Sequence, residues 1–388
     1  MELRKLTIDS PDIPILEEIN EEAIPECERN SFRDLMNTGA TILGIYDDGP
    51  VGFLVIREYR TILYLAYLAV NSSLRSKGIG GRALEELVSK YSDHMLVVEY
   101  EAPNLSSPEC ELNFRRKGFY KRNGFCETGY YTFYDDTEFE IGCAGMEFDA
   151  ELFGEFIEHL STIVSDHIPK PYKMNLKNVY FIIGTSYAGK STLVKNLARK
   201  HNGIALEENY HDEKLPELDS KVFPNLTYTR DLQDWHDFIR RTPDEYVTWI
   251  NNVKKECEIV ELQILKEMLG KSEVQNKKIF VDTNICIETL HKISDTDHVL
   301  VMLADPEIGI HRFFDRPDPE KQFLYQLMLE EPDPQAALDN YREILTRICS
   351  KESYEELENS GFELIYRDEN RTHEETVRLA EKMLRIVG

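Results

Sequence analysis

The chain has 388 residues and a formal net charge of −26, with 41% hydrophobic and 30% charged residues. This length exceeds one ordinary core and predicts two domains, while the acidic charge disfavours nucleic acid and anionic membranes as partners. The longest apolar run, 62–70, is too short for a membrane span. Seven scattered cysteines and the absence of a signal-like N-terminus predict a reduced, cytoplasmic protein.

The first half alternates strand-like and helical runs. Apolar runs on either side of a turn from Asp47 to Pro50 predict a β-hairpin. Further strands are predicted at 61–70 and 95–101, and the periodicity of 80–91 indicates a helix between them.

A glycine-containing loop follows the strand at 61–70 and precedes that helix. It has the spacing Arg75-x-x-Gly78-x-Gly80. Glycines let backbone amides approach a pyrophosphate, and the helix offers its positive N-terminal end. Alone, such a turn is a weak signal. The candidate phosphate-binding residues are Arg75, Ser76, Lys77, Gly78, Ile79, Gly80 and Gly81.

A second segment, Asn113-x6-Tyr120-x3-Gly124-Phe125, lies further along the chain. Together the two segments resemble the GNAT superfamily of N-acetyltransferases, over most of 1–147. The resemblance implies a GNAT mixed sheet, acetyl-CoA as cofactor and an amine as acceptor. It also implies that the amides of 76–81 hold the pyrophosphate, that Asn113 contacts the pantetheine arm and that Tyr120 protonates the leaving thiolate. The bulky Arg116 departs from the family pattern, which often has a small residue there.

Acetyl transfer to an amine also needs a group that takes a proton. Glu99 and Glu101 end the strand at 95–101 and lie on one face of it, because side chains alternate along a strand. Both are candidates for the base. The alternative is that both are ordinary surface acids at a strand end.

Residues 148–167 predict an amphipathic helix with Asp149 as its N-cap, and two prolines follow, at 169 and 171. We therefore expect a connector at 148–175 between a first domain at 1–147 and a second at 176–388.

The second half of the chain contains several short apolar runs, and helical segments lie between them. Such alternation predicts a parallel α/β sheet covered on both faces. The expected strands are 178–184, 203–206, 278–282, 298–304 and 362–366.

The first of these strands runs into a complete G-x4-G-K-S sequence followed by a helix, which is the context that a phosphate-binding loop requires. Its amides would wrap a phosphate, Lys190 would reach the β- and γ-phosphates, and Ser191 would bind Mg²⁺. Asp282, at the end of a later strand, is a second magnesium ligand or the cap of the next helix. The loop residues are Gly184, Thr185, Ser186, Tyr187, Ala188, Gly189, Lys190, Ser191 and Thr192.

Residues 176–388 also resemble P-loop small-molecule and nucleoside kinases, though less specifically than the loop itself. The resemblance implies ATP as cofactor and a lid in which Arg312 and Arg316, one helical turn apart, close over the phosphates. A phosphoryl acceptor also needs a carboxylate to position its hydroxyl. The candidates follow the second strand and are Glu207, Glu208 and Asp212.

The favoured hypothesis is therefore a bifunctional enzyme that acetylates an amine and phosphorylates a hydroxyl group with ATP. A cationic, hydroxylated amine would suit both halves and the acidic charge. The alternative is an acetyltransferase regulated by a non-catalytic ATP-binding domain. Partners are small molecules in both cases, with neither nucleic acid nor membrane, and the oligomeric state is left open.

Overall fold

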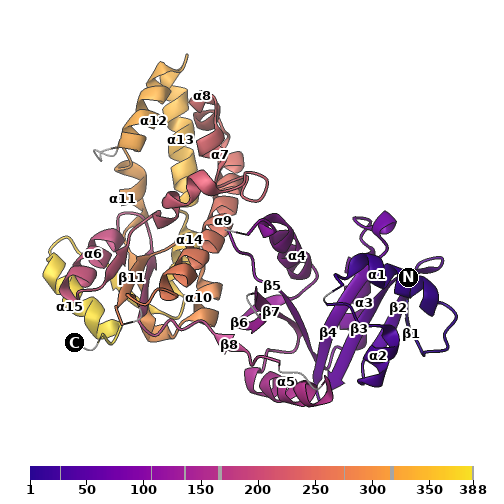
Figure 1. The fold of residues 1–388 in the computed structure, drawn as a ribbon. Helices are drawn as coiled ribbons and strands as arrows, with labels where there is room; N and C mark the ends of the chain where they lie inside the picture. The colour runs from indigo at the N-terminus through magenta and orange to yellow at the C-terminus, as the bar shows by residue number, and fades with distance from the viewer. Residues whose placement is uncertain are drawn as a thin grey trace. The chain divides into compact units, whose positions relative to one another are not determined.

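The computed structural model describes residues 1–26, 28–105, 107–134, 137–164, 168–274, 276–314 and 319–386. The chain divides into two compact units, Met1–Met174 and Asn175–Gly388 (Figure 1). Within the described ranges, no helix is long and apolar enough to cross a membrane.

The first unit is built on one mixed sheet with the strand order β1-β2-β3-β4-β5-β7-β6-β8. The predicted hairpin is confirmed as β2 and β3, which pair antiparallel, whereas β4 and β5 pair in parallel. The strands are β1 Glu2–Lys5, β2 Thr41–Tyr46, β3 Pro50–Tyr59, β4 Ile62–Val70, β5 Met95–Glu101, β6 Cys126–Tyr134, β7 Thr137–Gly145 and β8 Tyr172–Lys173.

Helices cover both faces of this sheet, because its strands bury side chains on alternate sides. On β4, Leu63 and Leu65 belong to the core under α3, whereas Ile62 packs in the core with α5. The short helices α1 and α2 pack on β2 and β3. The bounds are α1 Ile13–Ala23, α2 Phe32–Asn37, η1 Ser72–Leu74, α3 Ile79–Lys90, α4 Cys110–Arg122 and α5 Ala150–Val164.

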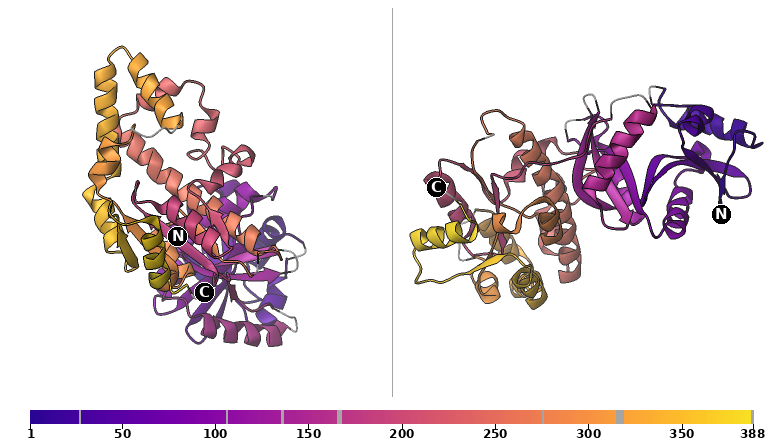
Figure 2. Two further views of the ribbon diagram at one scale, coloured as in Figure 1. Left: turned by 90° about the vertical axis from the view of Figure 1, so that its left-hand side faces the viewer. Right: turned by 90° about the horizontal axis from the view of Figure 1, so that it is seen from below.

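Helix α5 differs from the connector that the sequence predicts at 148–175. Asp149 does cap it, since the Asp149 carboxylate accepts from the amides of Glu151 and Leu152 at 3.0 Å. However, Phe153 and Phe156 are buried against β4, β5 and β7, and Figure 2 shows the helix lying across these strands. The helix therefore belongs to the core of the first unit, which extends to Met174.

The second unit contains a five-stranded sheet in which every described pairing is parallel, as the sequence predicts. Its order is β10-β11-β9-β12-β13, so the first strand of this unit, β9, lies in the middle. The strands are β9 Val179–Gly184, β10 Ile204–Leu206, β11 Ile279–Asp282, β12 Val299–Leu303 and β13 Glu363–Tyr366.

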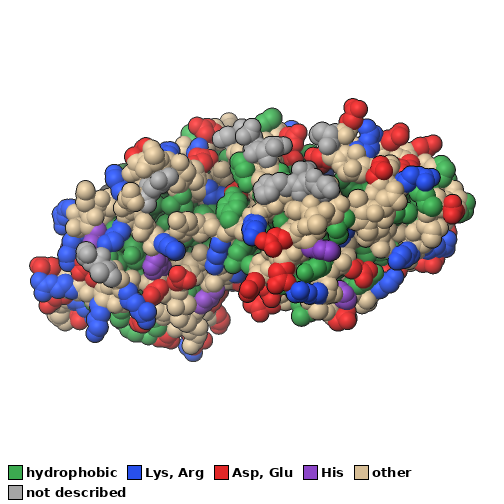
Figure 3. Space-filling model, turned by 60° about the horizontal axis from the view of Figure 1, so that its bottom comes forward, with side chains coloured by type: hydrophobic (Ala, Val, Ile, Leu, Met, Phe, Trp, Pro, Cys, Tyr) green, Lys and Arg blue, Asp and Glu red, His purple; other side chains and the backbone are tan. Residues whose placement is uncertain are grey.

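Helices α6 and α15 bury one face of this sheet, and Figure 1 shows α10 and α14 on the other side. A second, largely aromatic core joins the remaining helices of the unit. On the face drawn in Figure 3, acidic and basic side chains are interspersed. The helices are α6 Lys190–Lys200, η2 Tyr210–Glu213, η3 Leu215–Glu217, α7 Tyr228–Asp231, α8 Trp235–Ile239, α9 Pro243–Leu269, α10 Ile287–Ile293, η4 Thr296–His298, α11 Pro306–His311, α12 Pro319–Glu330, α13 Pro334–Ile348, α14 Lys351–Glu358 and α15 His373–Met383.

Candidate functional site

The first candidate site lies where β4 and β5 separate. The two strands pair only from Ile62 with Met95 to Leu65 with Val98. Beyond these pairs β4 continues to Val70 and β5 to Glu101 without pairing to each other. An extra residue on β4, Ala66, adds a bulge at the same point, between Leu65 and Tyr67, and bulges bend a strand away from its partner. The sheet is therefore open between the carboxyl ends of two parallel strands.

The glycine loop lies at one end of this opening, between β4 and α3. Ser76 and Gly78 have φ values of +63° and +78°, so the chain turns sharply just before the helix begins at Ile79. The first amides of α3 lack helical partners and could hold an anionic group. Arg75 donates from Nε to the carbonyl of Val70 at 3.2 Å, and Lys77 is exposed.

The other residues of the loop have packing roles that the sequence did not predict. Ile79 is 5% exposed and belongs to the core. A Cβ at Gly80 would lie 3.3 Å from the ring of Phe119, and one at Gly81 would lie 2.8 Å from Oδ1 of Asn123. These two glycines therefore let α3 approach the end of α4, so their small size is explained by helix packing.

Asn113 and Tyr120 lie on α4. Asn113 is 4% exposed, and its Oδ1 is buried with no hydrogen-bond partner among the described residues. Leaving a buried acceptor unpaired costs about 1–3 kcal/mol, so this atom is suited to a donor from a ligand. The ring of Tyr120 stacks on Tyr100 of β5, with 5.4 Å between centroids. Burial raises the pKa of Tyr120 to about 12, and the hydroxyl is therefore protonated at neutral pH.

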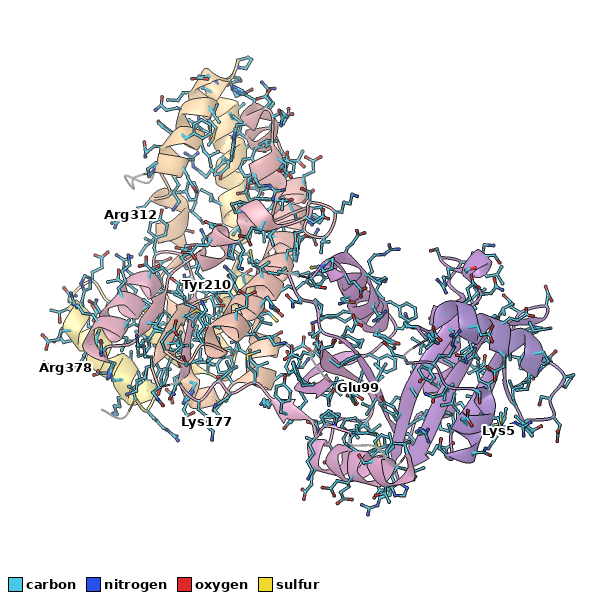
Figure 4. All side chains as sticks on the ribbon, in the orientation of Figure 1. Lys5, Glu99, Lys177, Tyr210, Arg312 and Arg378 are labelled. Carbon is cyan, nitrogen blue, oxygen red and sulfur yellow. The ribbon has the colours of Figure 1, made fainter. Side chains whose placement is uncertain are left out.

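Glu99 lies on β5 (Figure 4), and three hydroxyl groups surround its carboxylate. Tyr64 donates at 2.8 Å and Tyr134 at 3.2 Å to Oε2, and Thr132 donates to Oε1. Burial raises the pKa of Glu99, and these three hydrogen bonds oppose the rise. The result is a carboxyl group whose pKa lies above its ordinary value, as a base working near neutral pH requires.

Glu101 has different surroundings, although it lies on the same face of β5. Its carboxylate is 4.0 Å from the guanidinium of Arg116 on α4, and both side chains are partly exposed. Of the two predicted bases, Glu99 is therefore the one enclosed by hydrogen-bond donors. The sequence did not predict Tyr64, Thr132 and Tyr134, and no local pattern distinguishes Tyr64, because the same strand also contains Tyr67.

Glu99 and Tyr120 approach the opening from opposite faces of the sheet. Tyr100, which stacks on Tyr120, belongs to the core under α3. Glu99, the preceding residue, points to the other face, where Tyr64 packs on Phe153 and Phe156. A group lying between the separated strands can thus meet an acid on one side and a base on the other.

The second candidate site is the glycine loop between β9 and α6. Gly184 has φ +139°, and a Cβ there would overlap the carbonyl oxygen of Met302 on β12. Gly189 and Tyr187 also have positive φ values, +95° and +64°. Thr185 is fixed to the neighbouring strand, since Ala304 N donates to its Oγ1 at 2.7 Å. The loop therefore turns sharply before α6 begins at Lys190. Of its other members, Ser186 and Thr192 are exposed and Ala188 is buried.

Ser191 and Lys190 meet Asp282 at the start of α6. Ser191 Oγ donates to Asp282 Oδ2 at 2.7 Å, and Lys190 Nζ is 3.9 Å from Oδ1. Burial raises the pKa of Asp282 to about 6, Lys190 and Ser191 oppose the rise, and the charge of Glu208 adds to it. A hydroxyl and a carboxylate are the hard oxygen ligands that Mg²⁺ takes, alongside water and phosphate. Among the described residues there is no group of three or more His, Cys, Asp or Glu side chains that could hold a metal.

The three predicted acceptor-side carboxylates have different partners. Glu207 pairs with Lys195 on α6, with Nζ 2.7 Å from Oε2. Asp212 is half exposed and lies 3.6 Å from Nε2 of His211. Glu208 is exposed, and its charge acts on Asp282. Of the three, Glu208 is thus the one whose charge raises the pKa of Asp282, the partner of Ser191.

A buried polar cluster beside these acids was not predicted. Glu261 of α9 is fully buried and accepts hydrogen bonds from Thr283 Oγ1 at 2.5 Å and from both the backbone and side-chain amides of Asn284 at 3.0 Å. Nδ1 of His211 lies 3.0 Å from the same carboxylate, and its Nε2 is 3.4 Å from the thiol of Cys257. Glu261 therefore joins the segment after β10 to the segment after β11.

Only one of the two predicted lid arginines can be placed. The sequence predicts that Arg312 lies on the face of a continuing helix. In the structure helix α11 ends at His311, and Arg312 is its C-cap. Its backbone carbonyl accepts from the hydroxyl of Tyr187 at 2.8 Å, and its guanidinium is 4.0 Å from Glu369. Figure 4 shows Arg312 beside α11. Arg316 lies outside the described residues.

Comparisons with known proteins concern the acetyltransferase-like part. Residues 38–127 match the family model for the acetyltransferase (GNAT) domain. Among solved structures, the chain is similar to an acetyltransferase of the GNAT family from Bacteroides thetaiotaomicron, with 30% identity, coverage of 42% of this chain and 98% of that chain, and a TM-score of 0.36.

Two further solved structures are similar at lower identity. The ribosomal-protein-S18-alanine N-acetyltransferase from Escherichia coli is 16% identical, with 38% of this chain and 96% of that chain covered and a TM-score of 0.30. The aminoglycoside 6′-N-acetyltransferase from Enterococcus faecium is 17% identical, with 37% and 96% covered and a TM-score of 0.30. No curated protein matches the chain.

Proposed function

We propose that this chain, which belongs to the GNAT acetyltransferase family through the domain at residues 38–127, transfers an acetyl group from acetyl-CoA to an amine between β4 and β5. The observation that carries the proposal is the placement of Tyr120 and Glu99 on opposite faces of the sheet at its opening. The unpartnered Oδ1 of Asn113 and the glycine loop before α3 fit the amide-rich arm and the pyrophosphate of the cofactor.

When bound, acetyl-CoA supplies the thioester whose carbonyl carbon is transferred. Glu99 would take a proton from the ammonium form of the acceptor, directly or through one water, because only a neutral amine has a lone pair for the new C–N bond. Tyr120, which is protonated at neutral pH, would give a proton to the sulfur as the C–S bond breaks, and the second proton released from the acetylated nitrogen would restore it. Tyr64, Thr132 and Tyr134 hold the Glu99 carboxylate in place.

For the second unit we propose ATP-dependent phosphoryl transfer to a hydroxyl group. The proposal is supported by the contact of Ser191 and Lys190 with Asp282, by a loop with three residues at positive φ, and by the charge of Glu208 near Asp282. In this reading Lys190 would hold the phosphates and Ser191 and Asp282 would hold Mg²⁺. Arg312, which follows α11, would add its positive charge near them.

The acceptor in this proposal is a cationic, hydroxylated amine, which suits both reactions and is attracted by the net charge of −26. The alternative for the second unit is regulation, in which ATP binds without transferring phosphate. Both hypotheses require the phosphate loop and Asp282. They differ in whether the γ-phosphate is transferred to an acceptor.

Two assays on the full chain test these proposals separately. Acetyl-CoA with a panel of hydroxylated amines should give free thiol and acetylated product. ATP labelled at the γ-phosphate should label the same acceptors, with the label lost in Lys190→Ala and strongly reduced in Glu208→Gln at unchanged ATP affinity. The kinase proposal is overturned if ATP binds tightly, labels no acceptor and changes the rate of acetylation. That result would favour an ATP-binding regulatory domain. Absence of thiol release with every amine would overturn the acetyltransferase proposal.

A further inference from the structure

The helical part of the second unit contains a cavity of roughly 650 Å³ that the proposed reactions do not use. Such a volume is within the range of small-molecule sites. Its walls come from the start of α7 and the segment before it, from α8 and the link to α9, and from the first turns of α9. They include Asn225, Tyr228, Arg241, Trp249 and Asn252. These elements pack on the aromatic core of the unit.

This cavity is separate from the phosphate loop. Trp249 lies near the start of α9, whereas Glu261 of the same helix is bonded to the segment just after Asp282. The two positions are about 18 Å apart along the helix axis, at about 1.5 Å per residue. The lining of the cavity also includes none of the phosphate-loop residues 184–192 and neither Asp282 nor Glu208.

Arg241 is the central charged group of the cavity. Its guanidinium lies 4.0 Å from the ring centroid of Tyr228 and 4.9 Å from that of Trp249. Its Nη1 is buried and has no hydrogen-bond partner in the described part of the chain. Within the same ranges the guanidinium forms no ion pair with a carboxylate. The aromatic rings thus fix the orientation of a cation whose donor capacity is unused.

The neighbouring charges of the cavity, in contrast, are already engaged. Arg240 pairs with Glu331 at 2.9 Å, and Asp244 pairs with Arg347. Glu245 forms the capping box at the start of α9, where it accepts from Thr242 N at 2.8 Å. Each of these three groups has a counter-charge or a hydrogen bond inside the fold. The exposed Asp237 also lines the cavity, and the charge of Arg241 adds to the hydrogen bonds of Thr242 in lowering the pKa of Glu245. Among the described residues, however, no hydrogen-bond acceptor contacts Nη1 of Arg241.

A guanidinium with free N–H groups recognises planar or tetrahedral oxyanions, often through two parallel hydrogen bonds. We propose that this cavity binds a small hydroxylated molecule through a carboxylate or phosphate group on Arg241. Asn252 and Thr248 supply neutral polar groups for its hydroxyls. Three carboxylates, those of Asp237, Asp244 and Glu245, line the cavity together with two arginines, so a ligand with a single anionic group is favoured over a polyanion such as nucleic acid.

Tryptophan fluorescence of the full chain tests this inference, because the protein has only two tryptophans. Trp249 lines the cavity, and Trp235 lies in the same helical core. The probes are inorganic phosphate, glycerol 3-phosphate and glycerate, titrated at constant ionic strength. We expect a saturable change at millimolar concentrations. The phosphate and carboxylate probes distinguish which oxyanion is preferred.

Three variants locate the response. Arg241→Gln should weaken binding at least tenfold, and Lys190→Ala, which alters the phosphate loop, should leave it unchanged. Asn252→Asp places a negative charge, like that of the ligand, at a half-buried position of α9 and leaves the contacts of Arg241 with the aromatic rings in place. It should also weaken binding, and it replaces Arg241→Gln as the test if that variant proves to be misfolded. The exposed Arg199→Gln on α6 is the matched control. The inference is overturned by a response to none of the probes, by a linear response, or by one that is lost in Lys190→Ala but kept in Arg241→Gln.

Discussion

The hydroxyl of Tyr64 on β4 donates a 2.8 Å hydrogen bond to Oε2 of Glu99 on β5. The bond joins the two strands where their backbone pairing ends, since the last pair is Leu65 with Val98. Two opposed effects meet at this carboxylate, because burial favours its neutral form while hydrogen bonds from Tyr64, Thr132 and Tyr134 favour the ionised form. The paired part of β4 therefore holds the proposed base at the point where the two strands begin to separate.

Glu99→Gln should lower kcat for acetyl transfer by about 10²–10⁴-fold, as expected for loss of one general base. Acetyl-CoA affinity should stay within about twofold, because the glutamine keeps the size of the side chain. For the wild type, kcat/KM should rise with pH through the raised pKa of Glu99, and this limb should disappear in the variant.

Glu101→Gln is the matched control, because Glu101 lies on the same face and pairs at 4.0 Å with Arg116. We expect less than about a threefold change. Equal losses in both variants would contradict the assignment of the base to Glu99.

Tyr120→Phe keeps the ring that stacks on Tyr100 and removes the proton. We expect kcat to fall by about 10²–10⁴-fold with little change in melting temperature or in acetyl-CoA affinity. Steady-state kinetics together with calorimetric titration of the cofactor measure both quantities. Wild-type turnover would leave Tyr120 with a packing role alone.

Gly184→Ala should severely destabilise the second unit, by at least about 3 kcal/mol, or prevent its folding. The added Cβ would overlap the carbonyl oxygen of Met302, and the φ of +139° is unfavourable for alanine. Gly270→Ala is the control in the same unit, because its nearest neighbours are at ordinary contact distance and its φ is −70°. We expect that control to change stability by no more than about 1 kcal/mol, as measured by urea unfolding.

Asp282→Asn should change how stability depends on pH. Burial raises the folded-state pKa of Asp282 to about 6, so the folded state binds this proton more tightly than the unfolded chain. The stability that the protonated form contributes is complete below about pH 4 and is lost as pH rises through about 6.

Without nucleotide or Mg²⁺, the stability of the wild type relative to Asp282→Asn should therefore fall by about 3 kcal/mol between pH 4 and pH 7, at about 1.4 kcal/mol per pKa unit. Chemical denaturation of both proteins at several pH values measures the difference. A difference that rises with pH, or does not vary, would contradict the prediction.

Glu261→Leu should cost about 3–5 kcal/mol, because it leaves several buried donors without an acceptor. Thr283, Asn284 and His211 all contact this carboxylate at 2.5–3.0 Å. Glu261→Gln retains one acceptor oxygen and should lie between the leucine variant and the wild type. Glu267→Gln on the same helix, which removes a partly exposed ion pair with Lys214, should cost no more than about 1 kcal/mol. Similar unfolding free energies for Glu261→Leu and Glu267→Gln would contradict a structural role for Glu261.

The amino-acid sequence alone predicted the elements that depend on local patterns. The hairpin at Asp47–Pro50, the strand and helix on either side of Gly78, and the strand and helix on either side of Gly189 all appear where alternation and turn chemistry indicate them. These features follow from residues near one another in the chain, because glycine conformations and apolar periodicity act over a few residues.

The tertiary structure alone decided which candidates have suitable surroundings. It showed that Glu99, and not Glu101, is enclosed by hydroxyl donors. It also placed helix α5 in the core of the first unit and showed that α11 ends before Arg312. It also brought His211 to Glu261 and placed Arg241 over aromatic rings, with its Nη1 bonded to no acceptor in the described ranges. Burial and hydrogen-bond partners depend on residues that are distant in the chain, and a single sequence carries no local signal for which of them meet.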